Sequence, residues 1–261
     1  MLHTNALEKL RQELSRKRKR PHAVYFSPSC DIFQLVPQVL ELGYQVLEHL
    51  LQEGIGVSFL TKGVIPPEHF DLLRRYAPHV RAQIGITTLD ADIATCFEPH
   101  AAQPGGRVTQ IEQLIAAGIE THARLDPILP GVTDDEQTLE VLFAELAHRG
   151  VKQSAASVLF FRPTIMHILK RELQGTRYTD VLLRHYSQCG RLGIHADRST
   201  VTALPQTIRE QIYANVRSIA ERHGIAVRIC ACKNPDIVTG SCRIAGRWEK
   251  PHPDNAQPVL F

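Results

Sequence analysis

The sequence predicts an α/β protein with a parallel sheet and helices on the outside. Three observations lead to this prediction. Short apolar runs alternate five times with helical segments before residue 163, with short connections between them. The apolar runs stop abruptly at polar residues, as expected where strands reach the carboxyl edge of a sheet. Glycine follows several helical segments at the position where a helix commonly ends.

The predicted elements follow one another in a regular order. Leu7, Leu10 and Leu14 have helical spacing and predict an amphipathic helix over 5–20. The predicted strands are 23–26, 57–62, 80–86, 119–125 and 151–161. Three of the predicted helices between them are 37–53, 107–117 and 134–149, which end at Gly54, Gly118 and Gly150 in that order. Two shorter helices are also predicted, one opened by Pro66-Pro67 and one containing Ile93 and Cys96.

The rhythm changes after residue 163. Helices are predicted over 164–173, 178–190 and 205–223, with a polar loop over 195–202, a short strand over 226–229 and a proline-containing tail over 248–261. We therefore divide the chain into a βα domain over 1–163 and a C-terminal helical extension over 164–261 that packs on it.

Composition excludes some classes of protein. At 261 residues, 43% of them hydrophobic, the chain is long enough for a full globular core. No apolar run approaches the roughly 20 residues of a membrane span, and no secretory signal precedes the first helix, so a cytoplasmic protein is expected. The net charge of +3 gives no general argument for nucleic-acid binding. The run Arg16-Lys17-Arg18-Lys19-Arg20 can contact phosphates, but such runs are more often solvated helix ends.

Six cysteines without a signal sequence favour metal binding, catalysis or burial over disulfides. Cys230, Cys232 and Cys242 are grouped and are the candidate metal ligands, with Cys189, His223 or a substrate as the fourth. Cys230 and Cys232 would project to one face if the strand over 226–229 continued. The alternative is that these three are buried or redox-inert thiols.

Polar residues follow four of the predicted strands. Asp31, Lys62, Thr87 and Asp126 lie at or just beyond strand ends, and we expect them to converge around one cavity at one mouth of the sheet. Asp31 can also cap a helical turn, and Lys62 can be an exposed lysine before a turn glycine. Arg124 and Asp126 are two residues apart on one strand, so both side chains can face the interior, where an unpaired charge is costly. This favours a partnership between them, either direct or through a ligand.

Three further residues near these strand ends have alternative roles. Asp90 can simply cap the next helix. Glu98 has two alternative roles: it can accept hydrogen bonds from Arg107 or from backbone amides, or it can act in catalysis. Arg162 follows the fifth strand and is placed to meet a phosphate or a carboxylate.

An ordered series of motifs resembles the radical-SAM proteins of the spore-photolyase and DNA repair photolyase group. The series is TKG at 61–63, GITTLD at 85–90, FEP at 97–99 and DPILPGVTDD at 126–135. The resemblance runs from about residue 5 to 150 in order. It implies a partial (β/α) barrel of the TIM type, a lyase-like activity and two cofactors, S-adenosylmethionine and a [4Fe–4S] cluster.

The resemblance also implies roles for individual residues. Asp31, with Ser29 in the same loop, would help hold the methionine amino group or the ribose of S-adenosylmethionine. Lys62 would hold the methionine carboxylate. The family tends to have a small hydroxyl residue near Gly85, where this chain has none, so Thr87 would make that cofactor contact. For Lys62 a Schiff-base role, as in barrel aldolases, is a third interpretation.

One part of the family pattern is absent: the sequence contains no CxxxCxxC motif. By resemblance this motif lies in the first βα unit and supplies the cluster thiolates. We expect that the chain begins after this unit, either through truncation at its N-terminus or through natural degeneration.

Three functions are consistent with these observations. The leading hypothesis is a radical-SAM-type protein that cleaves S-adenosylmethionine reductively and abstracts hydrogen from an unspecified substrate, with this chain alone inactive. The second is a non-catalytic barrel that binds S-adenosylmethionine, nucleotide or nucleic acid. The third is a Schiff-base lyase using Lys62.

Overall fold

A six-stranded parallel sheet forms the centre of the computed structural model, which describes residues 3–26, 30–194 and 199–238. The strand order is β1-β2-β3-β4-β5-β8, and every neighbouring pair is parallel. The strands are β1 (Ala23–Phe26), β2 (Gly56–Thr61), β3 (Val80–Gly85), β4 (Glu120–Ile128), β5 (Gln153–Val158) and β8 (Ala226–Ile229). The predicted α/β class is therefore confirmed.

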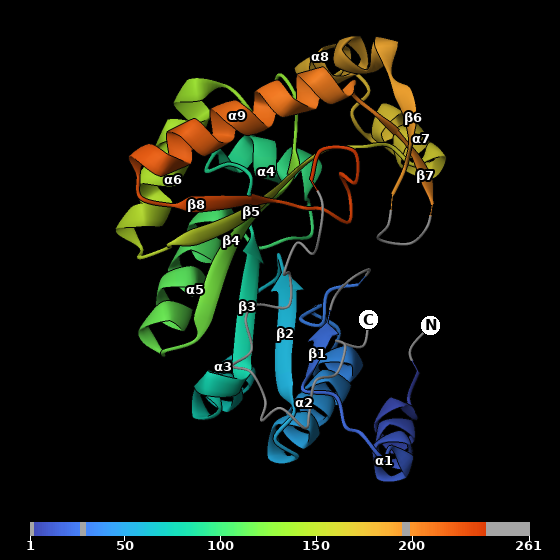
Figure 1. Cartoon of the computed structure of the whole chain (residues 1–261), viewed down its shortest axis with the longest axis vertical. Helices are drawn as coiled ribbons and strands as arrows, with labels where there is room; N and C mark the ends of the chain where they lie inside the picture. Colours follow the sequence, from blue (N-terminus) through green and yellow to red (C-terminus); the bar gives the residue numbers. More distant parts are fainter. Residues whose placement is uncertain (1–2, 27–29, 195–198, 239–261) are drawn as a thin grey trace.

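The sheet is an open half-barrel. Figure 1 shows that the strand direction rotates strongly from β1 to β8, so that the sheet curves. Among the described strands, β1 and β8 lie at its two edges and do not pair with each other. This agrees with the predicted partial (β/α) barrel.

The last strand of the sheet comes from the segment that the sequence pattern assigns to the C-terminal extension. Ala226–Ile229 is a strand, as predicted, and it pairs in parallel with β5 from Gln153 to Ala156. Residues 164–238 therefore contribute a strand to the sheet, in addition to helices outside it.

Helices surround the sheet (Figure 1). They are α1 (Ala6–Arg16), α2 (Pro37–Gln52), α3 (Pro67–Arg75), α4 (Ala91–Phe97), α5 (Pro104–Ala116), α6 (Glu136–His148), α7 (Pro163–Glu172), α8 (Arg177–His185) and α9 (Gln206–Arg222). Of these, α2, α5, α6 and α9 lie along the outer side of the sheet. Helix α1 ends at Arg16, so Lys17 to Arg20 follow the helix instead of lying within it. Gly54, Gly118 and Gly150 have positive φ angles directly after α2, α5 and α6, which confirms the three predicted helix ends.

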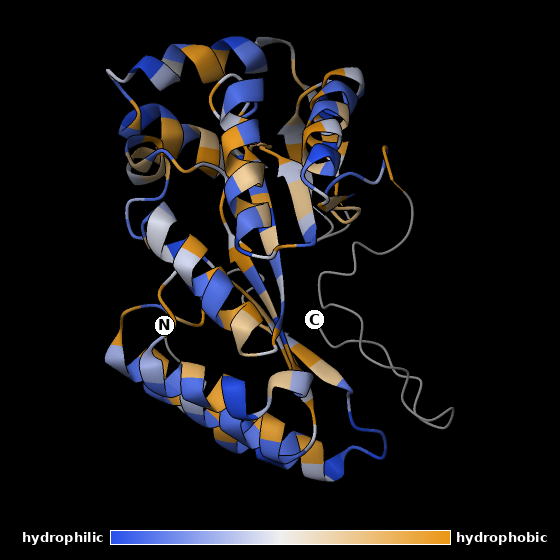
Figure 2. Ribbon diagram, turned by 90° about the vertical axis from the view of Figure 1, so that its left-hand side faces the viewer, coloured by the Kyte–Doolittle hydropathy of each residue, from blue (hydrophilic) through white to orange (hydrophobic). Residues whose placement is uncertain are grey.

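The hydrophobic core lies between the sheet and these helices. Leu47 and Leu50 of α2, Ile111 of α5 and Leu142 of α6 are fully buried against the strands. Figure 2 shows that the helices carry both hydrophilic and hydrophobic residues along their length, as expected when only one face of a helix is buried.

The region between α8 and α9 differs from its prediction. Instead of a helix to 190 and a polar loop, the chain forms an antiparallel pair, β6 (Gly190–Gly193) and β7 (Thr200–Ala203). Phe161 and Thr202 exchange backbone hydrogen bonds of 2.8 Å, which connect β7 to the residues that follow β5. Threonine and valine in TVTA favour a strand, which pairs with the nearby β6 and, through Thr202, with the more distant Phe161.

Within the described ranges, no helix combines the length and the apolar character that a bilayer crossing requires.

Candidate functional site

The candidate site lies at the carboxyl edge of the parallel sheet. The segments that follow β1, β2 and β3 carry Asp31, Lys62 and Thr87, and Asp126 lies near the end of β4. In open α/β sheets this edge is where ligands bind. The structure thus brings these four predicted residues to one end of the sheet.

Asp31 connects the loop after β1 to the loop after β2. Its Oδ2 accepts hydrogen bonds from the Thr61 hydroxyl at 2.8 Å and from the backbone N–H of Lys62 at 2.9 Å and of Gly63 at 3.3 Å. Its Oδ1 accepts from the backbone N–H of Phe33 at 2.9 Å, as in an Asx turn. Asp31 therefore fixes the backbone from which the Lys62 side chain projects.

Lys62, Glu98 and Arg107 form a charged group at the end of β2. The Lys62 Nζ donates to Oε1 of Glu98 at 2.5 Å, and the guanidinium of Arg107 donates to Oε2 of the same carboxylate. Arg107 projects from α5, is 2% exposed, and also donates to the backbone carbonyl oxygens of Gly85 and Ala102. The sequence-based interpretation of Glu98 as a partner of Arg107 is confirmed.

The charge of Glu98 is stabilised in this arrangement. Burial alone would raise the pKa of Glu98, but the nearby charges of Lys62 and Arg107 and their hydrogen bonds outweigh it, so the pKa lies below its ordinary value. Glu98 is therefore an anion in the folded protein at neutral pH and holds the lysine in one position.

Two cavities meet at the Lys62–Glu98 pair. The first, which we call the outer cleft, has a volume of about 1060 Å³. It is lined by the loop after β1, residues 60–64 and residues 98–102, with Asp31 and Lys62 among them. The second, the inner cavity, has a volume of about 230 Å³ and lies at the ends of β3, β4 and β5. Lys62 and Glu98 line both cavities.

The inner cavity is mainly apolar. Its walls include Phe97 of α4, Leu129 and Leu159 after β4 and β5, and Leu169 of α7. Thr87 is 7% exposed and adds a hydroxyl to this cavity. Thr88, also a wall residue, accepts a hydrogen bond from the backbone N–H of Asp90 at 3.0 Å. Asp90 caps α4 by accepting from Asp92 and Ile93, which confirms its capping interpretation.

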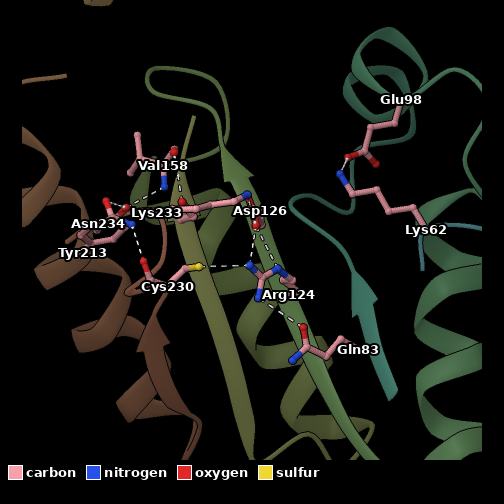
Figure 3. Close-up of polar contacts among 11 residues, drawn as sticks. Lys62, Gln83, Glu98, Arg124, Asp126, Val158, Tyr213, Cys230, Lys233 and Asn234 are labelled. Atoms are coloured by element: carbon pink, nitrogen blue, oxygen red, sulfur yellow. Dashed lines mark hydrogen bonds and ion pairs between the residues drawn. The ribbon is translucent and has the colours of Figure 1, made fainter. Parts of the chain in front are cut away.

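A second charged group occupies the interior of the half-barrel. Arg124 donates to Oδ2 of Asp126 from Nε at 3.0 Å and from Nη2 at 2.7 Å, as the mutual pairing predicts. Lys233 donates to both oxygens of Asp126, at 2.8 and 2.7 Å. Gln83 and Cys230 accept further bonds from Arg124 at 3.3 and 3.6 Å (Figure 3).

Asp126 is held as an anion by its neighbours. Burial alone would raise the pKa of Asp126, but the charges of Lys233 and Arg124, the hydrogen bond from Lys233 and the more distant charge of Lys62 lower it well below the ordinary range. Asp126 is not among the residues that line the outer cleft or the inner cavity, although its neighbour Pro127 lines the inner one. The four predicted residues thus share one edge of the sheet but do not surround a single cavity.

The predicted cysteine cluster is only partly within the described residues. Cys230 is 2% exposed and Cys232 is half-buried, whereas Cys242 and the predicted cofactor residue Ser29 lie outside these residues. The strand ends at Ile229 and the chain turns at 231–233, so the condition for Cys230 and Cys232 to project to one face is not met. His223 contacts Glu140 at 2.8 Å.

Across the described ranges, no group of three or more His, Cys, Asp or Glu side chains is arranged to hold a metal ion. The metal role of Cys230, Cys232 and Cys242 stays a prediction.

Sequence reasoning missed Lys233. The signal that could have identified it is a lysine placed shortly after the end of a strand, as Lys62 is.

The basic run after α1 is exposed, and Arg20 forms an ion pair with Glu53. Its predicted contact with nucleic acid is not tested by these contacts.

Comparison with known proteins supports the family resemblance. No protein-family model matches the sequence. The chain is 29% identical over 157 residues to an uncharacterized protein of Acidianus two-tailed virus, covering 59% of this chain and 52% of that one. It is 26% identical over 152 residues to an uncharacterized protein of Mycobacterium tuberculosis, covering 58% of this chain and 45% of that one. The chain thus spans about half the length of these relatives.

Relatives with named activities are radical-SAM proteins. A radical SAM Nalpha-GlyT isomerase of Pseudomonas phage M6 is 29% identical over 143 residues, covering 55% of this chain and 29% of that one. A spore photoproduct lyase variant with bound AdoMet and dinucleoside spore photoproduct superposes with a TM-score of 0.66 at 15% identity. The superposition covers 85% of this chain and 64% of the lyase.

The fold is therefore that of the radical-SAM enzymes. Within that class, the solved structures it resembles are those of spore photoproduct lyase, as the motif series indicates.

Proposed function

We propose that this chain is the S-adenosylmethionine-binding part of a radical-SAM-type protein of the photolyase-like group. The observation that carries the proposal is the position of Lys62 and Asp31 together in the outer cleft, at the carboxyl edge of a half-barrel with the fold of an AdoMet-bound lyase. The proposal assigns the outer cleft to the cofactor and the inner cavity to part of the substrate.

The donor set of the outer cleft suits an amino-acid carboxylate. An ammonium group has three N–H donors, and the contact with Glu98 uses one of those of Lys62. The side chain is 29% exposed, so the remaining donors can reach a ligand. Glu98 and the loop fixed by Asp31 hold the lysine in place before the ligand arrives, which lowers the entropy lost on binding.

The shape of the cleft suits the rest of the molecule. Leu35 and Val64 line the outer cleft and are 76% and 51% exposed, so they offer an apolar surface to an adenine ring. Thr87 lines the inner cavity, on the opposite side of Lys62, and does not line the outer cleft, so on this division of the cavities its hydroxyl contacts the substrate.

The iron–sulfur cluster implied by the family does not fit the described residues. Among them, the cysteines do not come together with each other, or with histidine or acidic side chains, in a group of three. The sequence contains no CxxxCxxC. We therefore derive no reaction step through a cluster from these residues, and the proposed role of this part of the protein is to bind and orient S-adenosylmethionine.

Isothermal titration calorimetry with S-adenosylmethionine, in the absence of iron, tests the binding proposal. We expect a saturable heat for the wild type and at least about a tenfold weaker affinity for Lys62→Met, since a charged hydrogen bond contributes about 1.5–3 kcal/mol. Lys152→Met is the matched control, because Lys152 is exposed and precedes β5 at the opposite edge of the sheet. Equal affinities for wild type and Lys62→Met would disprove the assignment of Lys62.

A second candidate function is a non-catalytic binding protein, for which the outer cleft and the preformed position of Lys62 are sufficient. The two candidates differ in one measurement. After anaerobic iron–sulfur reconstitution, a radical-SAM enzyme cleaves S-adenosylmethionine when a reductant is added, and a binding protein returns it unchanged.

The Schiff-base alternative has less support. A Schiff-base lysine needs its amine free to attack a carbonyl carbon, and the Lys62 Nζ instead donates to Oε1 of Glu98. Borohydride trapping with a carbonyl substrate remains the direct test of that chemistry.

A further inference from the structure

Two charged groups of the same composition flank the mouth of the half-barrel. In each, two cations surround one carboxylate: Lys62 and Arg107 surround Glu98, and Arg124 and Lys233 surround Asp126. Figure 3 shows Lys62 and Lys233 extending toward this region from opposite sides, with Asp126 between them. Each group therefore has one positive charge more than its carboxylate neutralises.

Among the described residues, a further carboxylate contacts only one of the two groups. Asp31 binds the backbone N–H of Lys62 and Gly63, so its negative charge lies beside the Lys62 group. The described residues that contact Arg124, Asp126 and Lys233 include Gln83, Cys230 and the ring of Phe160, and none of these three is a carboxylate. The uncompensated positive charge thus lies on the side of Arg124 and Lys233.

This charge lies in a site that water screens poorly. The side chain of Arg124 is 2% exposed, and that of Asp126 is 9% exposed. Burial of charge is costly unless it is paired, and an excess cation in such a place strongly favours the approach of an anion. Buried charged groups of this kind cluster at functional sites, which makes this one a candidate.

Lys233 provides the point of contact. Its ammonium is held by both oxygens of Asp126 and lies 5.3 Å from the centre of the Phe160 ring, so two neighbouring residues fix its position. The side chain is 27% exposed. Of the three N–H donors of an ammonium, the contacts with Asp126 occupy two at most, and one is left for a ligand.

We propose that Lys233, positioned by Asp126 and backed by Arg124, forms a second anion subsite that takes a phosphate or carboxylate group of the substrate. The subsite is distinct from Lys62, which the proposed function assigns to the cofactor. This inference rests on the proposed function in one respect: it takes the anionic group to belong to the substrate and not to S-adenosylmethionine.

Inorganic phosphate and acetate, at constant ionic strength set with chloride, are the two probes for this subsite. Thermal unfolding measures binding, because a ligand that binds the folded state raises Tm with its concentration. We expect phosphate or acetate to stabilise the wild type, and whichever of the two acts more strongly identifies the anionic group. Lys233→Gln should lower the affinity for the stabilising anion at least about tenfold, as expected for loss of a charged partner.

Two variants keep the result independent of folding. Lys233→Arg retains the charge and should retain most of the anion response. Lys152→Gln removes an exposed lysine from the opposite edge of the sheet and should leave the response unchanged. Without anion, Lys233→Gln should remain folded, since Arg124 and Asp126 still form a neutral pair.

A titration of S-adenosylmethionine in parallel separates the two proposals. If Lys233→Gln still binds S-adenosylmethionine but no longer responds to the anion, the result supports both the proposed function and the anion subsite. An intact anion response that depends on Lys233, without S-adenosylmethionine binding, leaves this inference standing and removes the proposed function. The same anion response in wild type and Lys233→Gln, or none in the wild type, overturns the subsite.

Discussion

The aliphatic chain of Lys62 lies directly against Gly85. A Cβ atom added at Gly85 would stand 2.7 Å from Cγ and 2.8 Å from Cε of the lysine, closer than such contacts occur. The absence of a side chain at the end of β3 is thus what allows the lysine to cross from the end of β2 to Glu98.

Gly85→Ala should move Lys62 and weaken binding of S-adenosylmethionine. The new methyl group overlaps the lysine chain, so the ammonium loses its place beside Glu98, and we expect about a tenfold loss of affinity in calorimetry. Gly106→Ala is the control, because no atom lies within 4 Å of a Cβ added there. Unchanged affinity for Gly85→Ala would show that the position of Lys62 is not important.

Asp126→Asn should destabilise the folded protein strongly. The change leaves Arg124 and Lys233 in the interior without a counter-charge, and removal of one partner from a buried ion pair costs about 3–5 kcal/mol. Urea unfolding at pH 7 measures the change in free energy. Asp71→Asn, which disrupts an exposed pair with Arg74, should cost less than about 1 kcal/mol. A similar small effect of Asp126→Asn would contradict the charge balance described above.

The stability of the protein should depend on the ionisation of Glu98. Its pKa is lower in the folded state than in the unfolded chain, so its contribution is complete above the unfolded value of about 4.3 and is lost as the pH falls through the folded value. We expect the free energy of unfolding of Glu98→Gln to fall less steeply between about pH 5 and pH 3 than that of the wild type. The exposed Glu172→Gln serves for comparison and should follow the wild-type curve.

Tyr213 of α9 connects three elements around the end of β5. Its hydroxyl accepts from the backbone N–H of Val158 at 2.9 Å and donates to Oδ1 of Asn234 at 2.9 Å. Tyr213→Phe leaves the buried N–H of Val158 without this acceptor and should cost about 1–3 kcal/mol in urea unfolding. Tyr76→Phe, whose hydroxyl has no hydrogen-bond partner among the described residues, should have little effect.

Tyr213 also makes the protein sensitive to alkali. Burial raises the pKa of Tyr213 to about 12, so its contribution to stability is complete below the unfolded value of about 10 and is lost as the pH rises further. Wild-type stability should therefore fall above about pH 10, and the fall should be smaller in Tyr213→Phe. Identical alkaline curves for the two proteins would rule out this contribution.

Local pattern was sufficient to predict the first five strands and the glycines that end three helices. It also predicted Arg124 and Asp126 as a pair, because their spacing places both side chains on one face of β4. Glu98 was identified with its partner Arg107. These predictions depend on features that lie within a few residues of one another, or on motifs that keep a fixed order.

Features that depend on distant partners were missed. The sequence identifies 226–229 as a strand, but its pairing with β5 is determined by packing of α9 and not by any local signal. The strands of the β6–β7 hairpin are four residues each, too short for a periodic pattern to identify. Lys233 follows β8, so its place beside Asp126 depends on the pairing of β8 with β5, which the predicted strand alone does not indicate.

The placement of β8 also bears on how the protein is made. The ribosome releases β5 well before Ala226–Ile229, and during this interval the edge of β5 lacks its native neighbour. Exposed strand edges pair readily with other chains. While the intervening helices are being synthesised, the exposed edge of β5 can therefore pair with another chain. Chaperones, or a low concentration of nascent chains, would limit this self-association.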